Sequence, residues 1–312
     1  MLESLILYWR MTRPGFLAIT LCASLLGVAT AAADGARVRW PTALATVLLA
    51  CLAHAAANVW NDYCDAQNGA DAANCEGIHP FTGGARLIQQ GRVSAAATAR
   101  WGVALMALLA AAGLWLAIGL GPLAPNLIGL GAVGLLLAWA YSAPPLALMS
   151  RGLGEAGVAL AWGLIVVGAD TVQRGHFAAA PCAAGWSMGL LAANILLING
   201  LPDARADAQT GKRTLAVRLG TSGVARGYLA LALAAHAGLT AAVGIGWLPV
   251  GALAGLTALP VSLTAARQLW RYARTEGHQS APETARLRAP IILTIVAANL
   301  YALAAAVGLA LF

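Results

Sequence analysis

Residues 41–60 read PTALATVLLACLAHAAANVW, and this stretch decides the class of fold. It contains no charged side chain over twenty residues, and as an α-helix it would span about 30 Å, the thickness of a bilayer's hydrocarbon core. The whole chain is 60% hydrophobic and only 10% charged, whereas soluble globular proteins carry about 25% charged residues. The sequence therefore predicts an integral membrane protein built from helices.

The remaining apolar runs are of similar length and are separated by polar or turn-forming breaks, such as GWLP at 246–249. They predict an all-α, polytopic membrane helical bundle of about nine transmembrane helices around a central cavity. We expect one domain over residues 1–312, built from two weakly similar parallel halves. The predicted spans are residues 15–34, 42–63, 97–119, 123–142, 154–171, 182–201, 225–244, 247–266 and 289–311.

The distribution of Lys and Arg predicts how the bundle is oriented. With the N-terminus inside, 16 of the 19 basic residues lie on the inner side. The positive-inside rule then predicts a cytoplasmic N-terminus and an outer C-terminus. We expect the membrane to be a bacterial inner membrane. The net charge of +7 fits loops that face anionic lipid and does not indicate nucleic acid.

An acidic stretch, NDYCDAQNGAD at 61–71, follows directly after the uncharged opening stretch. Asn58, Asn61 and Asp65 are three and four residues apart, so they share one helix face if the helix continues that far. Asp62 is expected to point away from that face. Ten of the twelve acidic residues lie on the predicted inner side together with the basic residues, which indicates a polar site there.

A second stretch, NGLPDARADAQTGKRT at 199–214, repeats this pattern at the inner end of the sixth predicted helix. Asn199, Asp203 and Asp207 are four residues apart and again share one face. Either stretch alone is also compatible with a solvated helix end. The matched spacing in two places, with basic residues beside each, favours a binding site.

The chemistry of the two stretches points to magnesium and phosphate. Neighbouring carboxylates repel one another unless a cation lies between them, and carboxylate and amide oxygens are ligands that suit Mg²⁺. Mg²⁺ typically takes one or two carboxylates and completes its shell with water and substrate phosphates. Arginine and lysine side chains nearby bind phosphate oxygens. We therefore predict a diphosphate held through Mg²⁺ between the two stretches.

These motifs resemble the two aspartate-rich motifs of the UbiA superfamily of intramembrane prenyltransferases, the second being DARADAQTGKRTLAVRLG at 203–220. YSAPPLALMSRGLGE at 141–155 and TVQRG at 171–175 are similar to segments of its 1,4-dihydroxy-2-naphthoate polyprenyltransferase branch. The first motif has Asp71 six residues after Asp65, as in that branch. The segment after the tyrosine departs from it, because the branch more often reads glycine-rich there.

The resemblance implies a Mg²⁺-dependent transfer of a polyprenyl group from an isoprenyl diphosphate to an aromatic acceptor. The branch implies 1,4-dihydroxy-2-naphthoate and quinone (menaquinone) biosynthesis; 4-hydroxybenzoate or another acceptor remains an alternative. An ion-coupled secondary transporter is disfavoured, because transporters place their acids near the midplane and often in inverted repeats. The expected partners are polyprenyl diphosphate, the acceptor and membrane lipid, with no nucleic acid and no obligate protein partner.

The resemblance implies roles for the motif residues, and the polar residues near the motifs add further candidates, among which Tyr141 is also compatible with a membrane-interface tyrosine and Arg13 with a plain inside-positive charge. The expected metal ligands are Asn61, Asp65, Asp71, Asp203 and Asp207. The expected catalytic residues are Asp65, Asp203 and Tyr141. Substrate contacts are expected from Asn58, Asn61, Arg13, Arg86, Asn199, Lys212 and Arg213.

Other polar residues carry no assigned role at this point. His54 is interpreted as a satisfied core histidine. The five cysteines contain no CxxC pair and are interpreted as buried thiols, and with the histidines they match no zinc-binding spacing. The roles of Arg151, Glu155 and Asp170 stay open, as do prenyl chain length, the proton acceptor and the oligomeric state.

Overall fold

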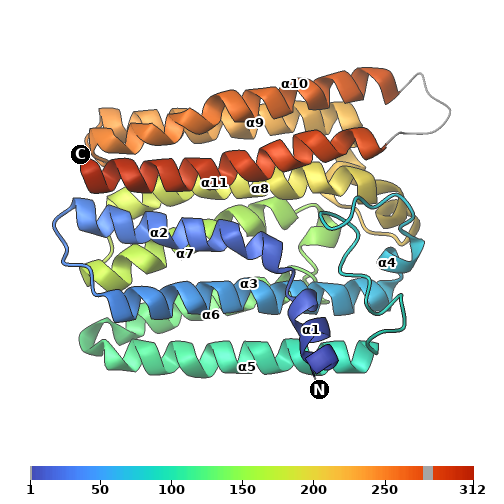
Figure 1. The fold of residues 1–312 in the computed structure, drawn as a ribbon, viewed down its shortest axis with the longest axis horizontal. Helices are drawn as coiled ribbons and strands as arrows, with labels where there is room; N and C mark the ends of the chain where they lie inside the picture. Colours follow the sequence, from blue (N-terminus) through green and yellow to red (C-terminus); the bar gives the residue numbers. More distant parts are fainter. Residues whose placement is uncertain (1, 277–283) are drawn as a thin grey trace.

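The computed structural model describes residues 2–276 and 284–312, and Figure 1 shows a bundle of long helices lying side by side. Within the described residues, nine helices are long and apolar enough to cross a membrane, which confirms the predicted class of fold. The spanning elements are α2 (Leu17–Ala33, after the 3₁₀ turn Pro14–Phe16), α3 (Trp40–Asn68), α5 (Ala95–Gly119), α6 (Ala124–Ala140, after Gly121–Leu123), α7 (Gly154–Arg174), α8 (Ala179–Gln209), α9 (Leu215–Gly244), α10 (Leu259–Glu276, after Val250–Ala258) and α11 (Arg288–Leu311, after Thr284–Leu287).

Two short helices lie outside the spanning set. Helix α1 (Leu2–Met11), which was not predicted, crosses the direction of the spanning helices, and α4 (Ala70–Ala73) follows α3. Helix α4 and residues 74–94 gather at one end of the bundle, called here the loop end (Figure 1). The C-terminus lies at the opposite end, called here the far end. Part of the predicted break between the last two spans, residues 277–283, lies outside the described residues.

Several helices are longer than predicted at the loop end. Helices α3 and α8 extend to Asn68 and Gln209 rather than to 63 and 201. Helix α9 begins at Leu215, so the long inner loop predicted over residues 202–224 is wrong. The prediction followed apolar runs, whereas helical hydrogen bonding continues through polar residues after the apolar run stops. Gly69 ends α3 because its φ of +82° is readily accessible only to glycine.

Glycines bring the backbones of several helices into contact. A Cβ added to Gly27 on α2 would lie 2.2 Å from the carbonyl oxygen of Val166 on α7. A Cβ on Gly189 of α8 would lie 2.2 Å from that of Ala159 on α7. Small residues are common at helix interfaces in membranes because they allow such close approach. Helices α2, α7 and α8 therefore form a tightly packed part of the bundle.

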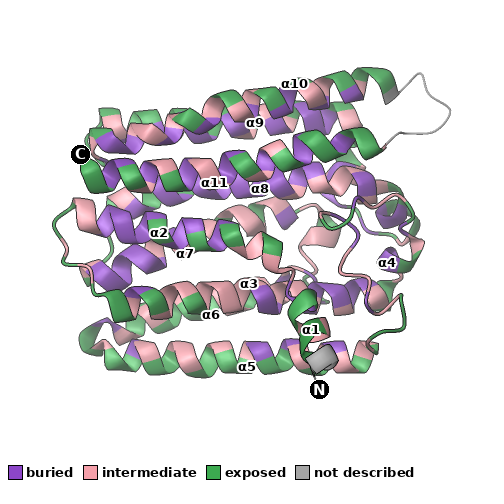
Figure 2. Ribbon diagram, in the orientation of Figure 1, coloured by how far each residue is buried: buried purple, intermediate pink, exposed green. Residues whose placement is uncertain are grey.

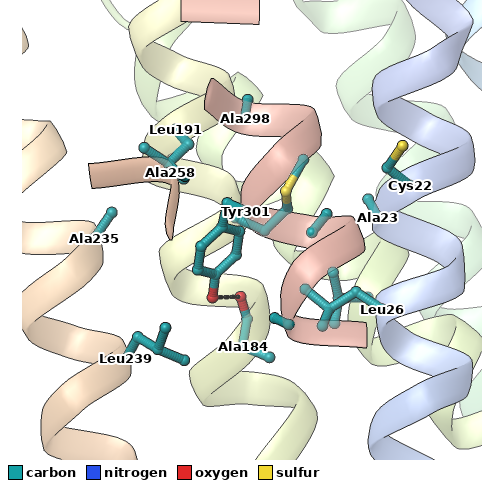
Figure 3. Packing of buried hydrophobic residues seen from close by; sticks show 14 of the residues in the cluster. Cys22, Ala23, Leu26, Ala184, Leu191, Ala235, Leu239, Ala258, Ala298 and Tyr301 are labelled. Carbon is teal, nitrogen blue, oxygen red and sulfur yellow. Dashed lines mark hydrogen bonds between the residues drawn. The ribbon is translucent and has the colours of Figure 1, made fainter. Parts of the chain in front are cut away.

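This packed part extends to α11 through an aromatic contact. Figure 3 shows Tyr301 of α11 among Leu191, Leu239 and Ala258, with its hydroxyl 3.4 Å from the carbonyl oxygen of Ala184 on α8. The hydroxyl donates to that oxygen, so the buried ring keeps a partner for its polar atom.

Helices α5 and α6 are packed much less closely. In the most apolar 18-residue stretch of each helix, only 17% of the residues of α5 and 11% of those of α6 are buried, compared with 78% for α8 (Figure 2). In a multi-pass membrane protein such exposed apolar surface faces lipid. These two helices therefore form an outer wall with lipid on one side.

A buried polar cluster closes the far end of α2 and α7. Asp170 is fully buried and lies 2.8 Å from Arg174 Nε and 2.9 Å from the hydroxyl of Thr30 on α2. Arg174 also forms an ion pair with Asp34. Asp34 and Asp170, the two acidic residues predicted to lie on the outer side, therefore both pair with Arg174.

Candidate active site

A cavity of about 640 Å³ lies among α3, α5, α6, α7 and α8. Most of its wall is apolar, and on α7 the lining runs from Glu155 to Val172, about 26 Å along the helix axis. Charged and amide side chains gather only where the cavity meets the loop end. The cavity thus has one polar head and a long apolar body.

Lys212 joins the two acidic stretches at this polar head. Its Nζ lies 2.9 Å from Asp65 Oδ1 on α3 and 3.1 Å from Asp207 Oδ1 on α8. Burial alone would lower the pKa of Lys212, but the two carboxylates outweigh burial and raise that pKa to about 12. The ammonium is therefore charged at neutral pH and neutralises the two acids. The predicted convergence of the two stretches is present in the fold.

The face of α3 predicted from the spacing also faces the cavity. Asn58, Asn61 and Asp65 all line it. The amide of Asn61 donates to Asp65 Oδ2 and to Ser142 Oγ, both at 3.0 Å. The amide of Asn58 donates to the carbonyl oxygen of Thr12 at 3.0 Å. These bonds fix the side chains between α3 and the segments that follow α1 and α6.

Asp62 lies outside the cavity lining, as expected, but it supports the site. Its carboxylate is buried and forms an ion pair with Arg13, which does line the cavity. Burial would lower the pKa of Arg13, but Asp62 outweighs burial and raises it. No short-range pattern predicts this pair, because 49 residues separate its members. Asp62 thus holds a permanent cation at the polar head.

On α8, Asp203 and Asn199 line the cavity. Asp203 accepts hydrogen bonds from the amide of Asn74 at 2.6 Å and from the backbone N–H of Gly83 at 3.3 Å. Asn199 Oδ1 is buried and has no hydrogen-bond partner within residues 2–276 and 284–312. Asn74, which was not predicted, therefore connects the loop after α4 to the second acidic stretch.

Asp71 follows α3 on α4 and also lines the cavity. Its Oδ2 lies 2.8 Å from where a Cβ of Gly84 would be, and Gly84 has a φ of +74°. Burial, reinforced by Asp65 and Asp62, raises the pKa of Asp71 to about 8. The bare carboxyl group therefore keeps its proton at neutral pH.

Two predicted substrate contacts lie elsewhere. The Arg86 guanidinium donates to the carbonyl oxygens of Asp71 at 3.3 Å and Asn74 at 2.7 Å, outside the cavity lining. Arg213 is exposed and is also absent from the lining; its N–H donates to the Ser150 carbonyl. Arg86 therefore fixes the loop, and Arg213 faces away from the cavity because its neighbour Lys212 points inward.

Tyr141 lines the cavity beside the polar head, at the end of α6. Burial is the main cause that raises the pKa of its phenol. The ring is therefore neutral and presents an aromatic surface next to the acids.

The donor set fits a hard divalent cation. Among the described residues no group of three or more His, Cys, Asp and Glu side chains forms a metal cage. Mg²⁺ needs only one or two carboxylates when phosphates complete its shell. Asp65 and Asp207 lie on either side of the Lys212 ammonium, and Asn61 on the same face as Asp65 adds a neutral oxygen. The cysteines do not contribute: Cys75 and Cys182 are exposed, which corrects their interpretation as buried thiols.

The chain matches known proteins over most of its length. The sequence model of the UbiA prenyltransferase family matches residues 20–287. The 1,4-dihydroxy-2-naphthoate octaprenyltransferase of Haemophilus influenzae is 31% identical over 230 residues, which cover 70% of each chain. The protein of the same name from Mycobacterium leprae is 31% identical over 258 residues, or 82% of each chain.

Solved structures share the fold. A UbiA homolog from Archaeoglobus fulgidus bound to DMAPP and Mg²⁺ has a TM-score of 0.57 at 16% identity, covering 96% of this chain and 99% of that chain. A structure concerned with digeranylgeranylglyceryl phosphate synthase has a TM-score of 0.60 at 13% identity, covering 99% and 100%. Taken with the converging acidic stretches and the apolar cavity, these matches establish that the chain is a multi-pass membrane enzyme belonging to the UbiA prenyltransferase family.

Proposed function

We propose that this enzyme transfers a polyprenyl group from an isoprenyl diphosphate to 1,4-dihydroxy-2-naphthoate in a Mg²⁺-dependent reaction. The observation that carries the proposal is the convergence of Asp65 and Asp207 on Lys212 at the head of a long apolar cavity. A polyprenyl diphosphate has the same division into a charged head and an apolar tail. The names of the two curated relatives support the choice of acceptor.

The polar head would bind the diphosphate. Mg²⁺, held by Asn61, Asp65, Asp71, Asp203 and Asp207, would supply Lewis-acid stabilisation of the leaving pyrophosphate. Lys212 and Arg13 are charged and line the cavity, so they would donate hydrogen bonds to phosphate oxygens. When the allylic carbon–oxygen bond breaks, its electron pair leaves with the pyrophosphate and these cations stabilise the charge.

The apolar body would protect the allylic cation that remains. Its wall of aliphatic side chains from α5, α6 and α7 excludes water, which would otherwise capture the cation. The neutral Tyr141 ring beside the polar head would stabilise the cation through its π face. The electron-rich acceptor ring then attacks the cation and loses a proton, and, as the resemblance to the naphthoate branch implies, its carboxyl group leaves as carbon dioxide.

The proposal includes the orientation predicted from the charges. The loop end would face the cytoplasm of a bacterial inner membrane, because 16 of the 19 Lys and Arg residues belong to that side. Soluble acceptors and released pyrophosphate would then exchange directly with the cytoplasm.

A reconstituted assay tests the proposal. Purified enzyme in lipid nanodiscs is given octaprenyl diphosphate and Mg²⁺ with either 1,4-dihydroxy-2-naphthoate or 4-hydroxybenzoate, and the product mass is measured. We expect a prenylated naphthalenediol that has lost carbon dioxide, released pyrophosphate, and no product after Mg²⁺ is chelated. Product formed only from 4-hydroxybenzoate would overturn the choice of acceptor.

Acid-to-alanine variants test the site itself. Asp65→Ala and Asp203→Ala should lose activity while they still insert and fold. Asp34→Ala is the matched control, because Asp34 is an exposed acid at the far end and should keep full activity. Near-normal turnover in either site variant would remove that residue from the site.

A further inference from the structure

One part of the cavity wall is neither acidic nor aliphatic. Arg13, His54 and Trp162 all line the cavity and come from the segment before α2, from α3 and from α7. We infer that these three side chains form the pocket for the aromatic acceptor, which they bind through its oxygen substituents. This inference rests on the proposed prenyl transfer and names the residues that recognise its second substrate.

His54 belongs to the same face of α3 as the site residues. It precedes Asn58 by four residues and Asp65 by eleven, and all three line the cavity. Along the helix axis His54 lies about 6 Å from Asn58 and about 16 Å from Asp65. The histidine therefore projects into the cavity just below the polar head, where an acceptor must meet the allylic carbon.

The His54 ring is fixed by two neighbours. Its Nδ1 lies 2.8 Å from Thr20 Oγ1 on α2. Its ring centroid lies 5.0 Å from that of Trp162, with the planes at 81°. Such edge-to-face packing is a favoured aromatic geometry. Because Nδ1 is engaged by Thr20, Nε2 is the ring nitrogen that is available to a ligand.

Two further hydrogen-bond donors in this pocket lack partners. Trp162 Nε1 and Arg13 Nε are both buried and form no hydrogen bond with any residue that the structure describes. A buried donor without a partner is unfavourable. A polyprenyl tail has no atom that accepts a hydrogen bond, and the diphosphate belongs with the acids. Hydroxyl and carboxylate oxygens on an aromatic ring would satisfy both donors.

A second histidine provides a matched control. His236 on α9 is buried, its Nδ1 lies 2.8 Å from the carbonyl oxygen of Ala232, and its ring packs edge-to-face on Tyr301 at 6.2 Å. His236 does not line the cavity. Each histidine has one hydrogen bond and one aromatic neighbour, whereas only the half-buried His54 reaches the cavity, so contact with the cavity is what distinguishes them.

The experiment compares His54→Phe with His236→Phe, since phenylalanine keeps the ring and removes both nitrogens. The Michaelis constants for 1,4-dihydroxy-2-naphthoate and for the polyprenyl diphosphate are measured in nanodiscs, and acceptor binding without donor is measured by equilibrium dialysis. For His54→Phe we expect the acceptor KM and Kd to rise about tenfold, as loss of one hydrogen bond implies, with the donor KM unchanged. Trp162→Phe should shift the same constants, and His236→Phe should shift neither.

Two results would overturn the inference. One is a rise in donor KM with an unchanged acceptor KM, because the pocket would then hold the prenyl tail. The other is equal behaviour of His54→Phe and His236→Phe. If His54→Phe fails to fold, Thr20→Val and Trp162→Phe carry the same test. If the wild-type enzyme uses another aromatic carboxylate, the constants are measured for that acceptor, so the acceptor proposal fails separately from the pocket.

Discussion

Replacing Lys212 by methionine tests how the polar head is held together. The substitution keeps the length of the side chain and removes its charge. Asp65 and Asp207 then face each other across a buried gap without the ammonium that now lies 2.9 and 3.1 Å from them.

The expected cost follows from burial and distance. The Lys212, Asp65 and Asp207 side chains are only 5%, 11% and 8% exposed, so water screens them little. At an effective dielectric constant of about 20, each ion pair at about 3 Å has an attraction of roughly 5 kcal/mol before desolvation is counted. Removing one partner of a buried pair typically costs about 3–5 kcal/mol net. With about 2 °C per kcal/mol for a chain of this size, we expect the melting temperature to fall by about 6–10 °C.

Thermal unfolding in nanodiscs, followed by tryptophan fluorescence, measures this effect. Lys212→Arg keeps the charge and should melt close to the wild-type temperature. Combining Lys212→Met with Asp207→Asn removes one of the two carboxylates that the ammonium had neutralised, so part of the lost melting temperature should be recovered. Mg²⁺ should stabilise Lys212→Met more than the wild-type protein, because a divalent cation replaces the missing charge. A Lys212→Met protein that melts like wild type without Mg²⁺ would refute the reasoning.

Three further predictions follow from other parts of the structure. Gly84→Ala should reduce both turnover and thermal stability, because a Cβ there meets Asp71 at 2.8 Å on a backbone with φ of +74°; unchanged turnover would contradict this. Gly131→Phe should block the use of long-chain but not of short-chain diphosphates, because Gly131 lines the cavity and has open space beside it. The control Gly129→Phe, on the same helix but outside the lining, should use donors of both lengths. Product masses from a series of donors of increasing length test this prediction, and equal use of long donors by the two variants would contradict it. Asp170→Asn should lower stability by about 3–5 kcal/mol by breaking a buried ion pair, while the folded fraction keeps its turnover; loss of turnover without loss of stability would contradict a structural role.

The spans and the acidic face were predictable because both depend on short-range patterns. An uncharged run of about twenty residues has to be a helix in a membrane, since its backbone groups must bond internally. The spacing of Asn58, Asn61 and Asp65 places them on one face in any α-helix. The structure shows that this face is the one that lines the cavity.

The contacts that complete the polar head were not predictable in the same way. Arg13 with Asp62 and Asn74 with Asp203 join residues 49 and 129 positions apart, and only the folded bundle brings them together. Arg86 was assigned to substrate because a basic residue beside an acidic stretch suits phosphate, but its Nη1 donates to two backbone carbonyls and the residue lies outside the cavity lining. The duplication into two parallel halves stays a prediction.

The uneven packing of the bundle has a consequence for how the enzyme is studied. The cavity is separated from the surrounding lipid by α5 and α6, a partition one helix thick whose outer surface has almost no protein behind it. Acyl chains therefore supply the mechanical support that a second layer of protein supplies elsewhere. Bilayer thickness and lateral pressure thus become variables of the reaction, and a detergent micelle changes the enzyme's own architecture as well as its solvent.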